Sequence, residues 1–261
     1  HLRDLHSFPT RRSSDLAPGM LHPELLFFGL RRCFGMNNNI IVCDTVKKIF
    51  ETQAEQLTIL NGINLEIESG KTVSITGPSG CGKSTLLSLI GGLDKVSSGT
   101  ILVNGFPVHN ANETELARFR SEKLGFIFQF HFLLKDFTAM ENIMMPHFLL
   151  YGNKNAAKKK AMDLLVSIGL ENRAGHYPEQ LSGGERQRIA IARALVNNPS
   201  VVLADEPTGN LDENNARLVE DLLLNTVHAF KTTLILVTHD RKFAQKTEQQ
   251  LVLHEGSILE A

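Results

Sequence analysis

A glycine-rich segment around residue 80 has the residue types needed to hold phosphate groups. It reads Gly77-Pro-Ser-Gly-Cys-Gly-Lys-Ser84. Glycines let backbone N–H groups curl around phosphates, and the N-terminus of a following helix adds favourable partial charge. Lys83 is expected to reach the β- and γ-phosphates of a nucleotide, and the Ser84 hydroxyl to bind Mg²⁺. The segment therefore predicts a nucleotide site formed by Gly77, Pro78, Ser79, Gly80, Cys81, Gly82, Lys83, Ser84 and Thr85.

Two acids and a histidine follow apolar runs further along the chain. Asp205 and Glu206 come after residues 201–204, and His239 comes shortly after residues 234–237. The first carboxylate can hold Mg²⁺, and the second can accept a proton from an attacking water. A histidine at the end of a sheet strand lies on the ligand side of a doubly wound fold. We therefore expect Asp205 to be a metal ligand, and Glu206 and His239 to be catalytic.

Between these segments lies Ser182-Gly-Gly-Glu185, directly before the apolar-periodic run 189–195. Serine followed three residues later by glutamate is the pattern of a helix capping box, so the segment predicts a well-capped helix. A helix N-terminus bared by glycines also suits a phosphate. The two interpretations are compatible, and Ser182, Gly183, Gly184 and Glu185 join the candidate nucleotide-binding residues.

The elements that must position these residues alternate between strands and helices. Residues 72–76 predict a strand that runs directly into the phosphate segment, and residues 201–204 and 234–237 are continuous apolar runs. Such runs are typical of strands buried on both faces of a parallel sheet. In an earlier strand, Ile63, Leu65 and Ile67 alternate with polar residues.

Two helical regions are also predicted. A helix should follow the phosphate segment, with one side lined by Leu86, Leu87, Leu89, Ile90 and Leu93. Between residues 130 and 180 the pattern is mostly helical, and it includes a helix over residues 156–168 that ends at Gly169. The sequence thus predicts a sheet-based nucleotide core with a helical insert.

Composition limits the class of protein further. The chain has 261 residues, a formal net charge of −1 and 42% hydrophobic residues, which fits one large α/β domain. This near-neutral balance gives no electrostatic footprint for nucleic acid. No apolar run approaches the roughly 18–20 residues that span a bilayer, so any membrane role requires a separate subunit. The three cysteines show no metal-ligand spacing, and one of them, Cys81, lies inside the phosphate segment, which fits a reducing compartment better than a disulfide framework.

The first 35 residues differ from the rest. They combine Phe8-Pro-Thr-Arg-Arg-Ser-Ser-Asp-Leu16 with a short apolar stretch, 25–30, and then Arg31 and Arg32. We interpret residues 1–35 as a non-native or disordered extension that carries no function, with Met36 as the start of the protein. Residues 36–261 then form the nucleotide-binding domain.

The combination of these motifs resembles the ATP-binding-cassette (ABC) transporter family, over about 220 residues from Ile40 to the C-terminus. The resemblance implies a P-loop NTPase core of ABC type with an antiparallel β subdomain and a helical subdomain at about residues 130–180. It implies an ATP hydrolase in which two copies pack head to tail, so that Ser182–Glu185 of one copy closes over the γ-phosphate held by the other. ATP and Mg²⁺ are the implied cofactors.

Further site residues are carried over from this resemblance. Phe50 occupies the place of the aromatic residue that stacks on adenine, although tyrosine is usual there. Gln129, after the strand 124–128, resembles the glutamine that contacts Mg²⁺ and water and senses the γ-phosphate. Gly209-Asn-Leu-Asp212 matches the loop that crosses the dimer interface, and His239 matches the residue that contacts the γ-phosphate and supports Glu206.

Within the family, the segments 123–138 and 190–212 look like those of ATP-binding subunits of the lipoprotein-releasing (Lol) system. This resemblance implies a peripheral protein on the cytoplasmic face of the inner membrane. There it would drive two integral-membrane permease subunits to release lipoproteins toward the outer membrane. Alternatives are a macrolide-type efflux ATPase and a cell-division ATPase that regulates wall hydrolases. A soluble ABC protein acting on DNA or ribosomes is disfavoured, because the chain lacks room for a second cassette or a long coiled coil.

The segment after Gln129 is unusually apolar and rich in methionine, which predicts the surface that contacts the membrane subunits. Flexible methionine and phenylalanine side chains suit a groove that accepts a partner's helix, although about half of these residues are expected to be core. The residues are Phe130, Phe132, Leu133, Met140, Met144, Met145 and Phe148.

Overall fold

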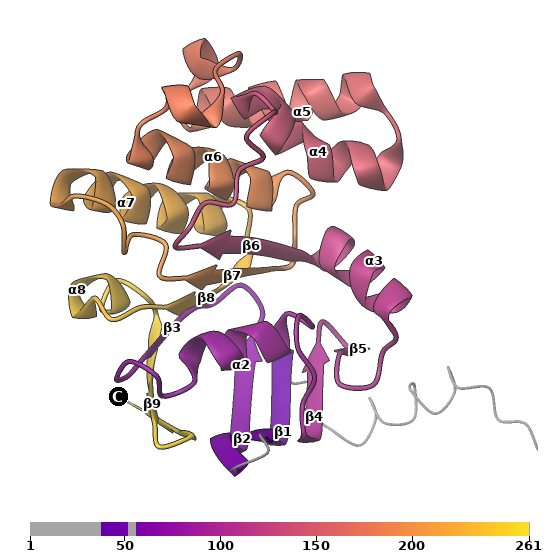
Figure 1. Ribbon diagram of the computed structural model, residues 1–261, viewed down its shortest axis with the longest axis vertical. Coiled ribbons are helices and arrows are strands. Elements are labelled where there is room, and N and C mark those ends of the chain that lie inside the picture. Colours follow the sequence, from indigo (N-terminus) through magenta and orange to yellow (C-terminus); the bar gives the residue numbers. More distant parts are fainter. Residues whose placement is uncertain (1–37, 52–55, 261) are drawn as a thin grey trace, which may run out of the picture. The chain divides into compact units, whose positions relative to one another are not determined.

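The computed structural model describes residues 38–51 and 56–260, which contain two β-sheets and the helices around them (Figure 1). The predicted extension 1–35 and the start at Met36 lie outside the described residues. Within the described residues, no helix is both long and apolar enough to cross a membrane.

A six-stranded sheet carries the centre of the fold, with strand order β10-β9-β3-β8-β7-β6. Neighbours from β9 to β6 run parallel, and β10 pairs antiparallel with β9. The strands are β3 (Thr72–Thr76), β6 (Leu124–Phe128), β7 (Val201–Asp205), β8 (Thr233–Val237), β9 (Gln249–His254) and β10 (Ser257–Glu260). The buried strands predicted from apolar runs are confirmed, because side chains on both faces of a covered parallel sheet must be apolar.

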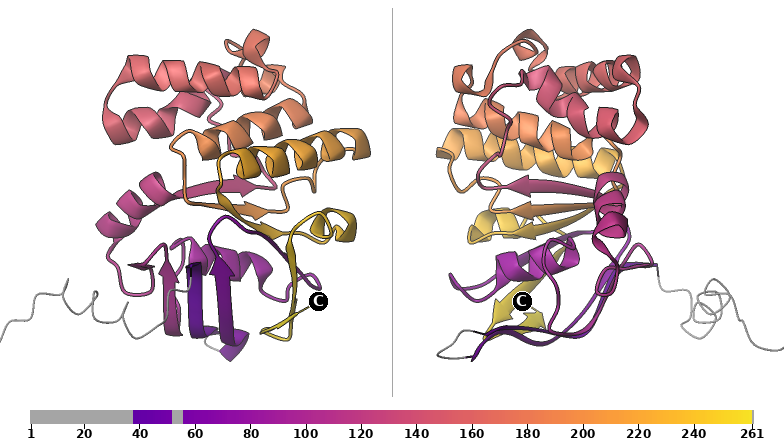
Figure 2. Two further views of the ribbon diagram at one scale, coloured as in Figure 1. Left: turned by 180° about the vertical axis from the view of Figure 1, so that it is seen from behind. Right: turned by 45° about the vertical axis from the view of Figure 1, so that its right-hand side comes forward.

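The two faces of this sheet are covered by different helices (Figures 1 and 2). Val201 and Leu203 of β7 pack in one core with α2 (Lys83–Ile90), whereas Val202 and Ala204 pack in another with α6 (Gly183–Leu195) and α7 (Glu213–Ala229). Successive side chains of a strand point to opposite faces. Helix α2 therefore covers one face of the sheet, and α6 and α7 cover the other.

The second sheet is antiparallel, with strand order β2-β1-β4-β5. Its strands are β1 (Asn39–Glu51), β2 (Gln56–Glu68), β4 (Ser98–Val103) and β5 (Phe106–Pro107), and α3 (Glu113–Lys123) follows β5. Ile63, Leu65 and Ile67 of β2 are buried in the same core as α2, which confirms the predicted alternation. This sheet therefore packs on the side of the molecule that carries α2.

The region between β6 and β7 is helical. It contains α4 (Ala139–Tyr151), α5 (Lys154–Ser167), the 3₁₀ turns η1 (Glu171–Arg173) and η2 (Pro178–Gln180), and then α6. One apolar cluster joins α4, α5 and α6 through Ile143, Leu165 and Ile189. Helix α5 begins two residues before the predicted start, and Gly169 with φ +67° follows its end. A short helix, α8 (Arg241–Ala244), lies between β8 and β9.

One predicted helical position is wrong. Leu93 lies beyond the end of α2 and is 50% exposed, whereas Leu86, Leu87, Leu89 and Ile90 are buried as expected. The helix stops because Gly92 adopts φ +62° and the Leu93 N–H turns back to the Ser88 carbonyl, 2.8 Å away. This is a glycine-based C-terminal stop, which the apolar periodicity alone did not reveal.

Candidate active site

The carboxyl ends of four parallel strands meet at one edge of the six-stranded sheet. In register, Ile75 of β3 lies beside Val237 of β8, Val237 beside Asp205 of β7, and Asp205 beside Phe128 of β6. The residues that follow these ends include the phosphate segment, His239, Glu206 and Gln129. In open α/β sheets, ligands bind at this edge.

The phosphate segment wraps closely around the start of α2. Gly82 is the N-cap, with φ +104° and no side chain to accept from the helix amides. A Cβ at Gly77 would lie 2.2 Å from the Leu253 carbonyl oxygen, so only glycine fits there. The Lys83 ammonium donates to the Gly77 and Pro78 carbonyls, each at 2.9 Å, which places its charge inside the loop.

Asp205 has the features of a metal ligand. Its Oδ1 is buried and has no hydrogen-bond partner within residues 38–51 and 56–260. Burial raises the pKa of this carboxyl, the nearby Ser84 hydroxyl lowers it, and the negative charge of Glu206 raises it. An unpaired buried carboxylate oxygen next to a serine hydroxyl suits Mg²⁺, a hard cation that prefers oxygen ligands. The residues therefore fit the expected metal.

Glu206 is held by two successive residues after β8. His239 Nδ1 lies 2.9 Å from Glu206 Oε1, and the Thr238 hydroxyl donates to Oε2 at 3.3 Å. Glu206 has φ +47°, a left-handed conformation that is unfavourable for a residue other than glycine. Its amide still donates to the Val237 carbonyl at 2.9 Å, so the strained turn is fixed against β8.

Gln129 lies against the loop that follows Glu206. Its Nε2 donates to Asn210 Oδ1 at 3.1 Å, and Asn210 Nδ2 donates back to the Gln129 carbonyl at 3.1 Å. A Cβ at Gly209 would lie 3.0 Å from Gln129 Nε2, so glycine allows this close packing. The structure thus joins two segments that the sequence analysis had connected only by family resemblance.

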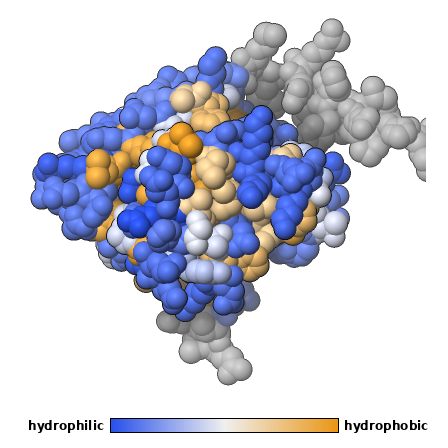
Figure 3. Space-filling model, turned by 90° about the horizontal axis from the view of Figure 1, so that it is seen from above, coloured by the Kyte–Doolittle hydropathy of each residue, from blue (hydrophilic) through white to orange (hydrophobic). Residues whose placement is uncertain are grey.

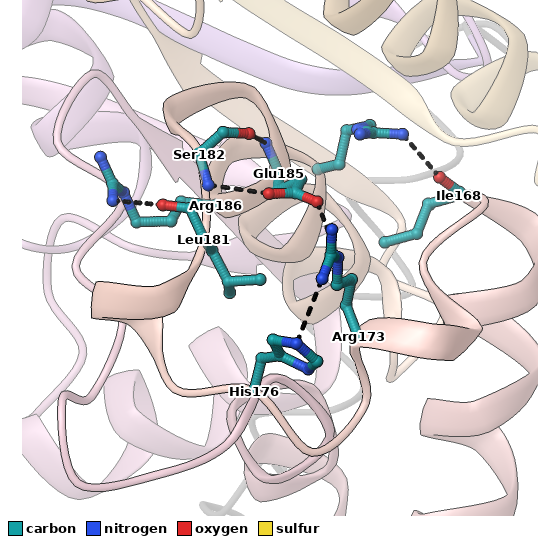
Figure 4. Close-up of polar contacts among 8 residues, drawn as sticks. Ile168, Arg173, His176, Leu181, Ser182, Glu185 and Arg186 are labelled. Atoms are coloured by element: carbon teal, nitrogen blue, oxygen red, sulfur yellow. Dashed lines mark hydrogen bonds and ion pairs between the residues drawn. The ribbon is translucent and has the colours of Figure 1, made fainter.

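The segment Ser182–Glu185 forms the predicted capping box at the start of α6 (Figure 4). Glu185 N–H donates to Ser182 Oγ at 3.2 Å, and Ser182 N–H donates to Glu185 Oε2 at 2.8 Å. Arg173 forms an ion pair with Glu185 at 3.1 Å and also lies 3.2 Å from His176 Nε2. The pKa of the Glu185 carboxyl is lowered, chiefly by the Ser182 N–H.

Two other predicted site residues have local partners. Asp212 is the N-cap of α7, where its Oδ1 accepts from the Asn214 and Asn215 amides at 3.1 Å. Phe50 on β1 is 43% exposed, and the Lys48 ammonium lies 4.7 Å from the centre of its ring. One face of this ring is therefore already used in a cation–π contact.

Most of the predicted residues fall into two groups within one chain. Residues 77–85, Asp205, Glu206 and His239 gather at the strand ends, whereas Ser182–Glu185 lies at the start of α6, on the face opposite α2. Across the parts of the chain that the structure describes, no hydrogen bond or ion pair joins the two groups.

Sequence reasoning missed three polar residues that shape the site. Thr238 contacts Glu206, Arg173 neutralises Glu185, and Arg193 donates to the His131 and Phe132 carbonyls at 2.8 and 2.7 Å. Burial lowers the pKa of the Arg193 guanidinium. Thr238 could have been noticed because it lies directly before His239. Nothing in the spacing of the two arginines indicated their partners.

Comparison with known proteins gives the class of this protein. Residues 60–209 match the family described as ABC transporter. The chain belongs to the ABC transporter family and is an ATP-binding cassette of that family. Similar relatives are Lipoprotein-releasing system ATP-binding protein LolD from Treponema denticola and the LolD protein of Legionella pneumophila (strain Paris). The first is 48% identical over 225 residues, covering 86% of this chain and 100% of the relative. The second is 48% identical over 223 residues, covering 85% and 98%.

Solved structures agree with this class. A dimeric ATP-binding cassette in a post-hydrolysis state, bound to ADP and Pi, superposes with a TM-score of 0.78 and 36% identity. The superposition covers 84% of this chain and 98% of that one. A second dimeric structure of the same cassette, described as a bacterial ABC transporter cassette, gives a TM-score of 0.77 and 38% identity, over 84% and 96% of the two chains. The α/β core with an antiparallel sheet is thus the ABC fold predicted from sequence.

Proposed function

We propose that this chain is the ATP-hydrolysing subunit of a lipoprotein-releasing transporter, and that it works as a head-to-tail dimer on two integral-membrane subunits. The proposal places it peripherally on the cytoplasmic face of the inner membrane. The cargo is inferred from the LolD relatives, which match over nearly their whole length. The chemistry is inferred from one observation above all, the Glu206 carboxylate held between His239 and Thr238, next to Asp205 with its buried Oδ1.

The proposed roles follow from the geometry at the strand ends. Backbone amides of residues 77–85 and the Lys83 ammonium bind the phosphates, with Phe50 against the base. Ser84, Asp205 and Gln129 are the proposed Mg²⁺ ligands, and the metal would neutralise charge on the phosphates. Glu206 accepts a proton from the attacking water, and His239 keeps its carboxylate in place.

The second copy supplies what one chain lacks in this proposal. Ser182, Gly183 and Gly184 at the start of α6 contact the γ-phosphate bound by the other copy, and Asp212 lies at the interface. A reciprocal arrangement of this kind makes two sites per dimer. Closing the dimer around ATP, and opening it after hydrolysis, moves the membrane subunits.

The surface proposed to contact those subunits is the apolar segment after Gln129. Phe130 and Phe132 are 65% and 64% exposed, whereas Met140 and Met144 are buried in the core of the helical region. Phe132 has φ +46°, and its ring packs edge-on against Phe128 with centroids 5.4 Å apart. Figure 3 views the molecule from the side of α4 and α5, and it shows apolar patches among polar residues there. Exposed aromatic residues of this kind are typical of interaction sites.

The proposal is tested by Phe132→Asp. A buried interface rejects a carboxylate, so the variant should lose co-purification with membrane subunits from detergent-solubilised membranes while ATP affinity stays within about twofold. Phe230→Asp is the matched control, because Phe230 is 42% exposed at the end of α7. Unchanged co-purification of the Phe132 variant would contradict the surface. Drug-efflux or cell-division partners in the wild-type eluate would contradict the cargo.

A further inference from the structure

Thr238 is a buried threonine that lies next to the candidate catalytic residues Glu206 and His239. It is 1% exposed, and its backbone N–H donates to the Ile75 carbonyl of β3 at 3.3 Å. Ile75 lies one residue before Thr76, the end of the strand that leads into the phosphate loop. The position of Thr238 is therefore fixed by the same strand that positions the phosphate loop.

The hydrogen bonds around the Thr238 hydroxyl determine its direction. The Asp240 N–H donates to Thr238 Oγ1 at 3.0 Å, so this oxygen is the acceptor in that bond. A hydroxyl group has a single hydrogen to donate. That hydrogen lies toward Glu206 Oε2, 3.3 Å from Oγ1. The hydroxyl is thus oriented by the backbone so that it donates to the carboxylate.

The two groups that hold Glu206 differ in their surroundings. The His239 side chain is 71% exposed, whereas Thr238 is almost completely buried. At 3.3 Å the Thr238 bond is longer than the 2.9 Å contact of His239, but it is shielded from water, and hydrogen bonds in a low-dielectric environment are stronger than those open to water. Because Glu206 also has a strained backbone, its side chain depends on such external contacts for its position.

We propose that Thr238 is a positioning residue that aims the Glu206 carboxylate at the attacking water. This inference rests on the proposed function, because it assumes that Glu206 is the general base. Thr238 holds Oε2, and Oε1, which also lies 2.9 Å from His239 Nδ1, takes the proton through its remaining lone pair. The water oxygen bonds to the γ-phosphorus, one water O–H bond breaks, and its proton passes to Oε1. The bond from the γ-phosphorus to the bridging oxygen breaks, and ADP keeps that electron pair.

Thr238→Val removes the hydroxyl but keeps nearly the same shape. Since a bond to a charged group is lost, kcat for ATP should fall about 10- to 100-fold while KM for ATP changes less than about twofold. Thr238→Ser restores the donor and should return kcat to within about threefold of wild type. If valine is not accommodated, Thr238→Ala removes the same hydroxyl without branching at Cβ.

Thr232→Val is the matched control. Thr232 is 2% exposed just before the opposite end of β8, and its hydroxyl donates to the Pro199 carbonyl at 3.0 Å. This change also removes one buried hydrogen bond from a hydroxyl group, but Thr232 lies beside the end of β8 that is remote from Glu206. The change should lower the thermal midpoint about as much as Thr238→Val does, and leave kcat unchanged. Equal losses of kcat in both variants would reduce Thr238 to a merely structural role.

The decisive test repeats Thr238→Val in the Glu206→Gln background. If Thr238 acts only through the Glu206 carboxylate, the second change should alter the residual rate less than about twofold. A full additional 10- to 100-fold loss in that background would overturn the inference. The same series separates the two proposals. Near-wild-type turnover of Glu206→Gln alone would contradict the general-base role of Glu206. An inactive Glu206→Gln together with a fully active Thr238→Val would contradict only the positioning role of Thr238.

Discussion

Two helices of this protein begin at glycine-rich segments, yet their N-termini are built differently. Helix α2 has Gly82 as its N-cap, no side-chain cap, and no acidic residue in its first turn. Helix α6 has Ser182 as its N-cap, a complete capping box, and Glu185 in its first turn. The first end carries the positive charge of Lys83, while the second carries a carboxylate paired with Arg173.

This difference determines how strongly the start of each helix can bind an anion. The amides of an uncapped helix start, together with a lysine, attract phosphate without further help. At α6 the chain's own side chains already satisfy one amide and complement the helix dipole, so only a few donors remain. We infer that α2 binds the nucleotide first and that α6 contributes after a second copy brings its phosphates close. The opposite faces on which the two helices lie agree with this division.

The largest predicted effect comes from damaging each end in a different copy. Lys83→Ala should lose nucleotide binding, and Ser182→Arg should lose hydrolysis by about 1000-fold with little loss of ATP affinity, because an arginine blocks only the partner's site. A one-to-one mixture can rebuild one intact site per mixed dimer, which amounts to roughly a quarter of the wild-type rate. ATPase assays of each variant and of the mixture measure this. No recovery on mixing would contradict a shared site.

The next largest effect is expected from Glu206, the proposed general base at the strand ends near the start of α2. Glu206→Gln keeps the shape and the bonding position of the side chain but cannot take a proton, so hydrolysis should fall by about 100-fold or more. ATP affinity should stay close to wild type, and the dimer should persist with ATP in size-exclusion chromatography. Glu141→Gln is the control, since Glu141 caps α4 away from the strand ends. A Glu206 variant that turns over normally would leave the strained residue without a catalytic role.

The buried strands, and the phosphate loop that precedes α2, were largely predictable from sequence. Buried parallel strands need continuous apolar runs, and the phosphate loop needs glycines at fixed spacing, so β3, β7 and β8 were found within a residue of their bounds. The end of α2 was not found, because Gly91 and Gly92 stop the helix through backbone hydrogen bonds that apolar spacing does not encode.

The contacts between distant segments were less predictable. The capping box of α6 was predicted because its partners are three residues apart, but Arg173 reaches Glu185 from outside the motif. Likewise, His239 was found by its place after a strand, whereas the role of Thr238 depends on the direction of one hydroxyl hydrogen bond. Short-range hydrogen bonds follow from local spacing, while pairings across the fold depend on how the elements pack.

A smaller effect should follow from forcing a side chain into the uncapped end of α2. A Cβ at Gly82 would lie 2.8 Å from Ile59 Cγ2, and its φ of +104° is unfavourable for alanine. Gly82→Ala should therefore weaken ATP binding about tenfold or more and cost about 1–3 kcal/mol of unfolding free energy. Gly70→Ala is the control, because Gly70 has φ +79° but open space around its Cβ position. Isothermal titration with ATP and urea unfolding measure the pair. Equal nucleotide affinities in the two variants would show that a side chain at Gly82 does not disturb the phosphate loop.

The smallest effect tests the self-capped end of α6. Glu185→Gln keeps an acceptor for the Ser182 N–H but loses the charge and the ion pair with Arg173, so unfolding should become easier by about 1 kcal/mol at pH 7. The Glu185 pKa is lowered from its ordinary value of 4.5 in the folded protein. A lowered pKa means that the charged form stabilises the fold above pH 4.5, and that this contribution disappears as the pH falls through the folded-state pKa.

The difference in unfolding free energy between wild type and Glu185→Gln should therefore shrink toward zero when urea unfolding is repeated at acidic pH. Glu179→Gln is the control, because Glu179 is exposed in η2 and forms no ion pair within the described residues. A Glu185 difference that stays constant between pH 7 and about pH 3 would mean that its charge does not stabilise α6. The capped end would then differ from the uncapped end only in its hydrogen bonds, and the electrostatic part of the comparison would have to be given up.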